Sequence, residues 1–372
     1  MKIGIITMHR VYNFGSALQA YALQQKLLEH GYDNQIIDYI YSYEDYNPTL
    51  AQYALDKIKY YAKVWLRYYK QMTLFHYFRK KYLKTTWREY TKHDLMNGKC
   101  PAFDVYMTGS DQVWNCKFTQ GDSNFVLKFA PQGAPRLSYA ASFASTRVPE
   151  QYENIFREGL PQYDSILVRE HSGVDIVKHL AGKKAEVVCD PTLLLTDAEY
   201  HVLASKSKLK MEAPFILVYI LDYMYNPYPD VYDIIRKVKS ELGFKVLYIG
   251  TDAPDPTDND SSFMGGQVGP LEFLWLVENA SFVITTSFHG TAFATIFHKS
   301  LFSVVQDTEA EDGRMQTLLR DLHQEKSLVA YNREISVDLI HSEEIISKEE
   351  CLDAIRKRSE SLLVNSLKNI QK

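Results

Sequence analysis

Short apolar runs alternate with amphipathic segments along most of this chain of 372 residues. In the first forty residues, "KIGIIT" predicts a buried strand, residues 16–31 carry apolar side chains at helical spacing, and "NQIIDYI" predicts a second strand. Gly31 marks the end of the expected helix. A strand, a helix and a strand in this order predict a βαβ unit with two parallel strands.

Seven later runs extend this alternation of strands and helices. Each run is apolar throughout rather than alternating with polar residues, as in strands that are covered on both faces. The runs are "AFDVYMTGS", "PRLSYAASF", "YDSILVRE", "KKAEVVCDPTLLL", "PFILVYIL", "FKVLYIGT" and "ASFVITTS". The chain is therefore expected to have an α/β fold with doubly wound parallel sheets.

The pattern also predicts how the chain divides into domains. Residues 189–214 are interpreted as the passage between two domains, because prolines stand near each end and a new strand follows at once. We expect an N-terminal Rossmann-like domain in residues 1–195, a C-terminal one in residues 214–330, and an amphipathic helix in residues 343–370 that packs back on them. Two such domains that face a cleft would bind ligands outside the carboxyl ends of their strands.

The composition excludes several classes of protein. With 46% hydrophobic and 24% charged residues the chain is expected to fold, and a net charge of −4 gives no reason to expect a nucleic-acid partner. The four cysteines lack metal or redox spacing, so we expect reduced thiols in a cytoplasmic protein. Neither a secretory signal nor a run of about 20 apolar residues occurs, so no transmembrane helix is predicted.

Polar residues follow four of the predicted strands, at the edge where ligands bind. Asn13 and Gly15 precede the first helix, with Ser16 as a candidate cap, although an ordinary turn explains them as well. Gly109 permits a tight turn that would place Asp111 as a hydrogen-bond acceptor or base. An Asx turn beside a buried tryptophan explains the same residues.

The other two segments contain Arg169 and His289. Arg169 ends an apolar strand and is either a surface charge or a clamp for a carboxylate or phosphate. His289 lies in "TTSFHGTAFATIF", between a strand and a helix whose first amides form an anion site. A lone histidine is more often structural, but Gly290 and the helix start favour a functional role here.

Fingerprints of cofactor sites are missing from the sequence. No "G-x-x-x-x-G-K-[ST]" occurs, and no "G-x-G-x-x-G" follows a strand, so we expect no phosphate loop, no dinucleotide and no other cofactor. The acidic segment 252–260 is interpreted as a solvated loop, and we expect no metal site.

Six motifs in order carry a resemblance to a known family. They are "NFGSALQAYAL…LLEHGY…IIDY", "TGSDQVWN", "LSYAASFA", "LVREHSG", "CDPTLLL" and "TTSFHGTAFATIF". Together they resemble the polysaccharide pyruvyltransferase family over most of residues 1–325. The resemblance implies a fold similar to that of GT-B glycosyltransferases. It also implies transfer of a pyruvyl group from phosphoenolpyruvate to two hydroxyls of a sugar, which gives a pyruvate ketal and phosphate during synthesis of a surface polysaccharide such as an exopolysaccharide or capsule.

The resemblance further implies roles on the donor side. His289 matches the family's catalytic histidine and is expected to be the general acid near the phosphate or C3 of the donor. Arg169 matches a basic residue that holds the donor's carboxylate or phosphate. The other expected donor contacts are Ser287, Gly290, Thr291, Lys299 and Arg314.

The sequence departs from one version of the family at Ser287, where that version has an arginine two positions before the histidine. Arg314, or Lys299 as the weaker candidate, would supply the missing positive charge. On the acceptor side, Asp111 is expected to bind the sugar and to act as its base. The other expected acceptor contacts are Asn13, Gly15 and Ser110.

Residues 53–90 form a basic and aromatic insert in the expected N-terminal domain. They contain ten lysine or arginine residues, two acidic residues and twelve aromatic residues. Basic, aromatic helices bind anionic bilayers, and the family's acceptors include lipid-linked glycans, so one interpretation is a peripheral contact at the inner face of the membrane. The other, which is the commoner case, is a pair of helices whose aromatic residues face the core and whose lysines are solvated.

Two further classes of function remain open from the sequence. A GT-B glycosyltransferase with a nucleotide-sugar donor would need an acidic residue for the ribose, and Glu272 is a candidate. A non-catalytic sugar-binding protein would keep the fold and lose little function in His289→Ala. Neither the acceptor sugar, nor the hydroxyls that form the ketal, nor the oligomeric state follows from the sequence.

Overall fold

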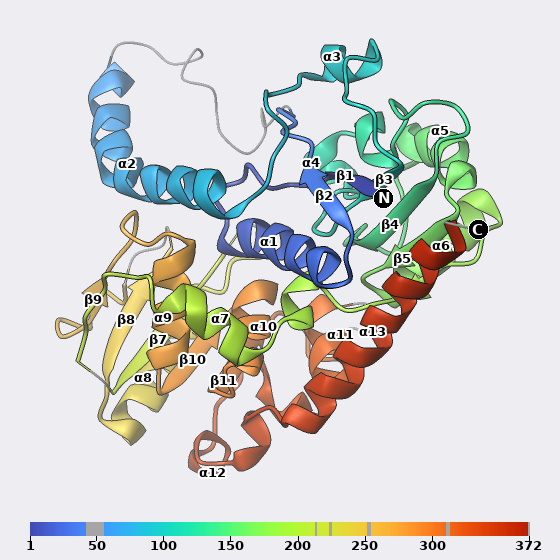
Figure 1. Ribbon diagram of the computed structural model, residues 1–372. Coiled ribbons are helices and arrows are strands. Elements are labelled where there is room, and N and C mark those ends of the chain that lie inside the picture. Colours follow the sequence, from blue (N-terminus) through green and yellow to red (C-terminus); the bar gives the residue numbers. More distant parts are fainter. Residues whose placement is uncertain (42–55, 213, 223–224, 251–253, 310–312, 371–372) are drawn as a thin grey trace. The chain divides into compact units, whose positions relative to one another are not determined.

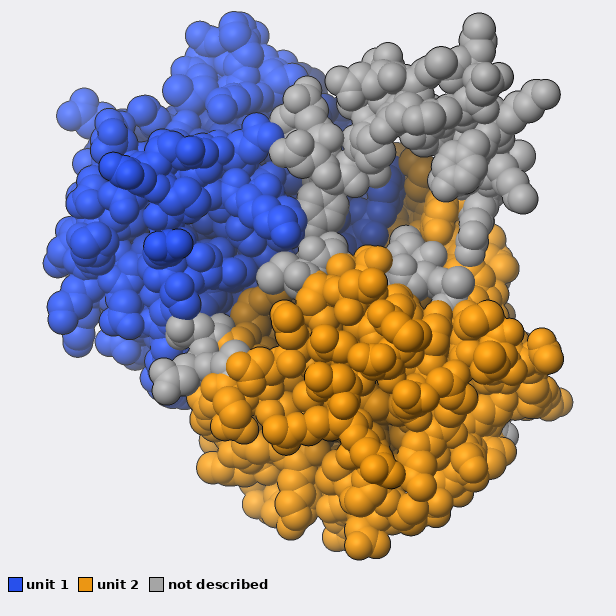
Figure 2. Space-filling view, turned by 180° about the vertical axis from the view of Figure 1, so that it is seen from behind, with its two compact units in different colours: residues 1–55, 79–194, 355–372 blue, residues 56–78, 195–354 orange. Residues whose placement is uncertain are grey.

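The computed structural model describes residues 1–41, 56–212, 214–222, 225–250, 254–309 and 313–370 (Figure 1). The chain forms two compact units, which Figure 2 shows in different colours. Unit 1 comprises residues 1–55, 79–194 and 355–372, and unit 2 comprises residues 56–78 and 195–354. The long helices α2 (Asp56–Tyr82) and α13 (Glu349–Ile370) each contribute residues to both units.

Unit 1 is built on a six-stranded sheet with the order β2-β1-β3-β4-β5-β6, in which neighbouring strands are parallel. β3 and β4 are buried throughout, because helices and loops cover both faces of the sheet. The elements are β1 (Lys2–Ile6), α1 (Phe14–Glu29), β2 (Asp33–Ile36), α3 (Lys92–Met96), β3 (Val105–Thr108), α4 (Cys116–Thr119), η2 (Ser123–Val126), β4 (Arg136–Ala141), α5 (Glu150–Gly159), η3 (Leu160–Gln162), β5 (Ser165–Val168), α6 (His171–Ala181), β6 (Glu186–Val187) and η4 (Pro191–Leu194).

Unit 2 has a second six-stranded parallel sheet, with the order β12-β11-β10-β7-β8-β9. Its strands β7 and β10 are buried at every position. The elements are α7 (Asp197–Ala204), β7 (Phe215–Tyr219), α8 (Val231–Leu242), β8 (Lys245–Ile249), β9 (Ser262–Phe263), α9 (Pro270–Asn279), β10 (Phe282–Thr285), α10 (Phe288–Ile296), β11 (Ser300–Val305), α11 (Arg314–Asp321), η5 (Glu325–Ser327), β12 (Leu328–Ala330), α12 (Val337–Ile340) and η6 (Glu343–Ile345).

The expected α/β class with parallel sheets is confirmed, and each apolar run named above contains a strand. Three strands of unit 2 were not expected. β9 has only two residues and β12 only three, too few for a recognisable apolar run, and β11 contains two serines that interrupt its apolar sequence.

The insert differs from the expected helical segment 53–90. Residues 53–55 lie outside the described part of the chain, and α2 ends at Tyr82. In the segment after it, Thr85 bridges to Ile36 at the end of β2, and Tyr90 bridges to Tyr39 beyond that strand. Residues 56–78 belong to unit 2 rather than to the N-terminal half. One of their contacts with unit 2 is the hydrogen bond from the amide of Gln71 to the carbonyl of Gly266, at 3.0 Å. Within the described residues, no helix is both long and apolar enough to cross a bilayer.

The strand order reverses once in each sheet. In unit 1, β1 lies between β2 and β3, so the chain moves to one side of β1 first and to the other side later. In unit 2, β7 lies in the same way between β8 and β10. At such a reversal point, the connections that follow the two neighbouring strands leave in opposite directions and open a space between them. Each unit can hold a ligand there: unit 1 at the carboxyl ends of β1 and β3, and unit 2 at those of β7 and β10.

The loop between β1 and α1, at the reversal point of unit 1, is held in place by hydrogen bonds. His9, between β1 and α1, is buried, and its Nε2 lies 2.9 Å from Oδ1 of Asp38. Arg10 donates to the same oxygen at 2.6 Å. Burial alone would raise the pKa of Asp38, but the hydrogen bonds and electrostatic attraction of His9 and Arg10 outweigh it and lower this pKa to about 2. The loop is therefore tied to the end of β2 by an ionised carboxylate.

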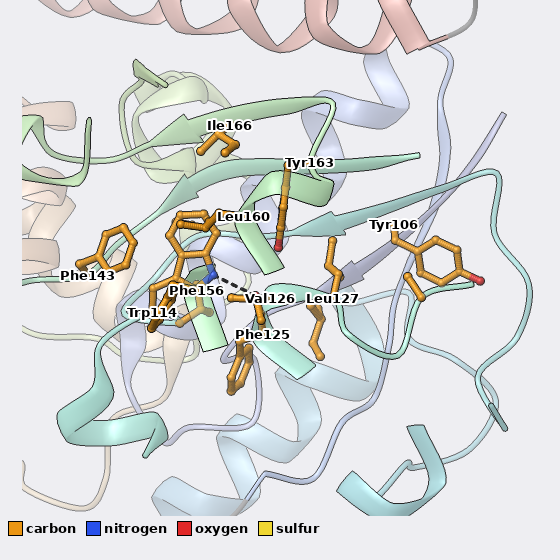
Figure 3. Close-up of a cluster of buried hydrophobic side chains, with 14 of the residues drawn as sticks. Tyr106, Trp114, Phe125, Val126, Leu127, Phe143, Phe156, Leu160, Tyr163 and Ile166 are labelled. Atoms are coloured by element: carbon orange, nitrogen blue, oxygen red, sulfur yellow. Dashed lines mark hydrogen bonds between the residues drawn. The ribbon is translucent and has the colours of Figure 1, made fainter. Parts of the chain in front are cut away.

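Trp114 anchors the loop after β3 in an aromatic core (Figure 3). Its side chain is 1% exposed, and its ring centroid lies 5.0 Å from that of Phe143 and 6.0 Å from that of Tyr163. The indole Nε1 donates to the carbonyl of Phe125 at 2.9 Å, so its one polar group is satisfied. This packing fixes the residues that lead from β3 toward the candidate site.

We predict that Trp114→Ala lowers the free energy of unfolding by about 3–5 kcal/mol, because it leaves a cavity in a closed core. Urea denaturation followed by circular dichroism measures the loss. Trp87→Ala is the matched control, because Trp87 is 83% exposed, and we expect it to change stability by less than about 0.5 kcal/mol. Equal effects of the two substitutions would contradict this account of the core.

Candidate functional site

At the reversal point of unit 1, the segment after β1 meets the segment after β3. The hydroxyl of Ser16, in the first turn of α1, donates to Oδ2 of Asp111. Asp111 is 6% exposed, has a left-handed backbone with φ of 77°, and accepts the amide of Gln112 through Oδ1 at 2.8 Å. The amide of Ser142 donates to the backbone carbonyl of Asp111 at 3.1 Å, which holds this loop against the end of β4. The carboxylate of Asp111 is therefore fixed in place.

The expectation that Ser16 caps α1 is wrong. Asn13 is the N-cap, and its side chain accepts the amide of Ser16 at 3.2 Å. Gly15 lies inside the first turn rather than before the helix. The hydroxyl of Ser16 is committed to Asp111 instead, so a residue that the sequence places at a cap links two strand ends.

A buried ion pair lies beside this group. Arg169 follows β5, and its Nη1 donates to Oδ2 of Asp190 at 3.0 Å. The hydroxyl of Ser110 donates to the same oxygen at 2.9 Å. Both side chains of the ion pair are almost fully buried, so Arg169 is not the surface charge that the sequence left open. It clamps a carboxylate, and that carboxylate belongs to the chain itself.

Three carboxylates set the electrostatics of this group. Burial alone would lower the pKa of Arg169, but the charges of Asp190, Glu170 and Asp111 outweigh it and raise this pKa. Glu170 Oε2 lies 3.7 Å from Nε of Arg169. Because one guanidinium faces three buried carboxylates, removing its charge would leave them to repel one another.

Asp190 and Glu170 are members of the site to which the sequence analysis gave no role. Both lie in motifs that were recognised, "CDPTLLL" and "LVREHSG". Each also stands one to three residues after a strand, the same position that singled out Arg169. An acidic residue two or three positions after a predicted strand was the signal that could have found them.

In unit 2, the other expected residues gather where β10 leads into α10. Ser287 is the N-cap of α10, and its hydroxyl oxygen accepts the amide of Gly290 at 3.3 Å. His289 is the second residue of the helix and is 6% exposed. The hydroxyl of Thr286 donates to the carbonyl of Leu221 at 2.9 Å, which ties the start of α10 to the end of β7. His289 therefore lies at the reversal point of unit 2.

Close packing holds the start of α10 against β10. A Cβ added to Gly290 would lie 2.4 Å from Oγ1 of Thr285, so only glycine fits there. That same oxygen accepts the amide of Ser287 at 3.0 Å. Thr291 follows Gly290, and its hydroxyl lies 2.8 Å from that of Ser303 on β11. Thr291 therefore packs the helix on the sheet.

The structure places one of the two candidate positive charges against Phe288, the residue before His289. The guanidinium carbon of Arg314 lies 5.8 Å from the ring centroid of Phe288, and the rings of Phe288 and His289 are 5.2 Å apart. Lys299 is not brought to this group. It lies beyond the far end of α10, just before β11, and burial lowers its pKa.

Two acidic features of unit 2 have local explanations. Glu272 accepts the amide of Gly269 at 3.1 Å and so completes the first turn of its own helix. In the described part of segment 252–260, Asp255 is 3% exposed and accepts from Arg236, so the expectation of a wholly solvated loop is wrong. Among the described residues, no group of three or more histidines, cysteines or acids could hold a metal ion.

The two units offer different chemistry. Fixed carboxylates in unit 1 accept hydrogen bonds, which suits hydroxyl groups of a polar ligand. In unit 2, the N-terminus of α10 and the guanidinium of Arg314 suit an anion, with the imidazole of His289 beside them as a proton donor.

Solved structures similar to this chain show the fold. UDP-GlcNAc 2-epimerase from Methanocaldococcus jannaschii has a TM-score of 0.53 at 12% identity, over 96% of this chain and 92% of that one. UDP-N-acetylglucosamine 2-epimerase from Rickettsia bellii has a TM-score of 0.54 at 10% identity, over 99% and 95%. Arabidopsis thaliana UGT89C1 in complex with UDP-L-rhamnose reaches 0.50 at 10%, over 100% and 97%. The chain has a two-domain α/β fold of the GT-B-like kind.

A comparison with curated proteins finds no match. The sequence profile described as "Polysaccharide pyruvyl transferase" matches residues 13–308, which include Ser16, Asp111, Arg169, Asp190 and His289, whereas β1 and Arg314 lie outside the matched range. The motifs recognised in the sequence and this match agree over most of the chain. The chain belongs to the polysaccharide pyruvyl transferase family.

Proposed function

We propose that this protein transfers the pyruvyl group of phosphoenolpyruvate to two hydroxyls of a sugar in a surface-polysaccharide precursor. The observation that carries the proposal is the group formed by His289, Arg314 and the start of α10, in a chain that belongs to this family. Phosphoenolpyruvate carries a carboxylate and a phosphate, and a helix N-terminus beside a guanidinium matches such a ligand.

The reaction balances without a further reactant. C3 of the enol gains a proton, C2 forms bonds to two sugar oxygens, and the bond from C2 to the phosphate oxygen breaks. The two hydroxyls release two protons, of which one is balanced by the proton added at C3 and the other leaves with phosphate. We assign His289 as the acid that protonates C3 or the departing phosphate.

Arg314 takes the place that an arginine at position 287 has in one version of the family. Ser287 is an N-cap here, so its side chain orients the first turn of α10 rather than supplying charge. Gly290 lets the helix approach β10, and Thr291 fixes the helix on β11. In this proposal the two residues position the donor site, and Arg314 contacts the donor's anionic groups.

The acceptor is assigned to the carboxylate group of unit 1. Asp111 would accept a hydrogen bond from a sugar hydroxyl and take its proton as C2 is attacked. Asn13 caps the helix turn that carries Ser16, the donor to Asp111, and Ser110 donates to the neighbouring Asp190. Gly15 as an acceptor contact stays a prediction. Arg169 as a donor ligand stays a prediction, and its bond to Asp190 means that a ligand would share this guanidinium with the protein's own carboxylate.

We predict that phosphoenolpyruvate binds the protein saturably in calorimetric titration, whereas UDP and GDP do not. Arg314→Gln should weaken the binding about tenfold or more, because a hydrogen bond to a charged group contributes about 1.5–3 kcal/mol. Arg320→Gln is the matched control, since Arg320 is exposed near the other end of α11. Binding of UDP or GDP without binding of phosphoenolpyruvate would replace this proposal with a nucleotide-sugar glycosyltransferase.

We predict that His289→Asn lowers the release of phosphate from phosphoenolpyruvate, in the presence of a panel of hexoses and hexosamines, by about 10²–10⁴-fold. Its affinity for phosphoenolpyruvate should change by less than about threefold. The control is His298→Asn, a second histidine that follows the end of α10. Unchanged turnover in His289→Asn would remove this residue from the chemistry, whereas loss of affinity alone would make it a binding residue.

A lipid-linked acceptor belongs to the same proposal. The described side chains of α2 divide between two environments: Phe75 and Phe78 are buried, whereas Tyr69 and Tyr77 are about half exposed. The exposed aromatic residues lie on the same helix as the basic residues that would contact anionic headgroups at the inner face of a membrane.

We predict that the protein sediments with vesicles of phosphatidylserine and phosphatidylcholine, but not with phosphatidylcholine alone, and that salt reverses this binding. The variant Lys80→Gln/Lys81→Gln should bind less, because each basic residue near the surface contributes about 1 kcal/mol. Lys206→Gln/Lys208→Gln, with exposed lysines outside α2, is the control. Sedimentation independent of lipid charge would remove the membrane contact from the proposal.

A further inference from the structure

Unit 1 contains a groove of about 780 Å³ that the preceding assignments do not use. It lies between the loop that follows β4, the first turns of α5 and one side of α6. Its volume falls in the range of roughly 300–1,000 Å³ that is usual for small-molecule sites. The lining residues are Ser145, Thr146, Arg147, Val148, Pro149, Glu150, Glu153, Asp175, Ile176, His179 and Leu180.

The lining combines an apolar base with polar groups around it. Val148, Ile176 and Leu180 are buried, so they form the buried part of the groove. Asp175 and His179 are exposed and lie one turn apart on α6, on the same side of the helix. Hydroxyl, carboxylate, guanidinium and imidazole groups thus surround an apolar surface, and a sugar ring offers the matching pattern of hydroxyls around C–H groups.

The side chain of Glu170 links the loop that lines the groove to the buried ion pair of the candidate site. Glu170 Oε1 accepts the hydroxyl of Ser142 at 2.8 Å and the amide of Ala144 at 2.9 Å. Ala144 has a left-handed φ of 48°, which turns the chain into the wall of the groove. Because the other oxygen of Glu170 lies 3.7 Å from Arg169, one side chain holds both the groove loop and the buried guanidinium.

The charge of the lining selects among sugars. Glu150, Glu153 and Asp175 carry negative charge, whereas Arg147 is the one arginine in the lining. Glu153 pairs with Arg157 at 2.9 Å, and even with that pair set aside two carboxylates face one guanidinium. A phosphate, nucleotide or uronic acid would meet like charge here, so the chemistry favours neutral sugars and amino sugars.

We propose that this groove binds neutral or amino sugars of the acceptor glycan that lie next to the sugar receiving the pyruvyl group. This inference rests on the proposed function. It means that the enzyme recognises a segment of several sugars rather than a single sugar. The class of reaction that supplies its substrate is then glycosyl transfer, which must extend the precursor before pyruvylation. Asp175 and His179 contact the neighbouring sugar, and Glu170 keeps the groove loop in position.

An array of bacterial surface-glycan fragments of one to six sugars, probed with the full-length protein, tests this groove. Among the fragments that bind, we expect those of three or more sugars to have an affinity at least about tenfold higher than that of their terminal monosaccharides. Asp175→Ala/His179→Ala should abolish that gain. Lys178→Ala, at an exposed position of α6 outside the lining, should keep it. Circular dichroism melting of each variant checks that the fold is retained.

Calorimetry with phosphoenolpyruvate on the same preparations separates the two levels of the proposal. If wild-type protein binds phosphoenolpyruvate but its glycan binding is absent, or does not depend on length, the groove assignment is overturned and the proposed function stands. If length-dependent glycan binding is lost in the double variant while no preparation binds phosphoenolpyruvate, the groove is a glycan site and pyruvyl transfer is overturned. Equal length dependence in the double variant and wild type also overturns the groove assignment.

Discussion

Strand order in the two parallel sheets constrains where this chain can hold ligands. A parallel strand must be followed by a crossover, and crossovers on either side of a reversal point leave in opposite directions. In unit 1 the reversal lies between β1 and β3, and the Ser16–Asp111 hydrogen bond joins the segments that follow these strands. In unit 2 the reversal lies between β7 and β10, and Thr286 ties the two segments together next to His289.

The two reversal points are stabilised in opposite ways. In unit 1, charged groups compensate one another in a buried network around Arg169, whose removal would leave carboxylates unpaired in a poorly solvated place. In unit 2, uncharged residues stabilise the reversal point. Ser287 caps α10, and Thr285 and Gly290 hold the start of this helix against β10. Carboxylates held by a guanidinium accept hydrogen bonds, whereas the free amides of a helix N-terminus attract anions, so the two reversal points differ in chemistry.

Fold and function rest on separate observations here. Epimerases that share little sequence with this chain have similar folds, so the architecture alone leaves the reaction open. The family match adds the reaction class, because it covers residues 13–308, which include Asp111, Arg169 and His289. The side-chain chemistry then adds a finer description. The start of α10 carries an imidazole next to the ring on which Arg314 packs, whereas the reversal point of unit 1 carries carboxylates paired with Arg169.

The sequence by itself determined the parallel strands, because strands covered on both faces are apolar at every position and need no tertiary information to be recognised. It also placed His289 at a helix start, since strand, serine, glycine and small residues follow one another locally. Local sequence could not find β9 or β12, which are short and depend on a neighbouring strand for their hydrogen bonds. It also assigned the cap of α1 to the wrong residue.

Only the tertiary structure decided which distant groups meet. The bond from Ser16 to Asp111 joins residues 95 positions apart, and the ion pair of Arg169 with Asp190 depends on the adjacency of β5 and β6. Arg314 reaches Phe288 from another helix, whereas Lys299, much nearer in sequence, lies beyond the other end of α10. The distance along the sequence therefore does not tell which of two basic residues lies at the start of α10. The direction of each helix and the order of the strands decide at which end of α10 each side chain lies.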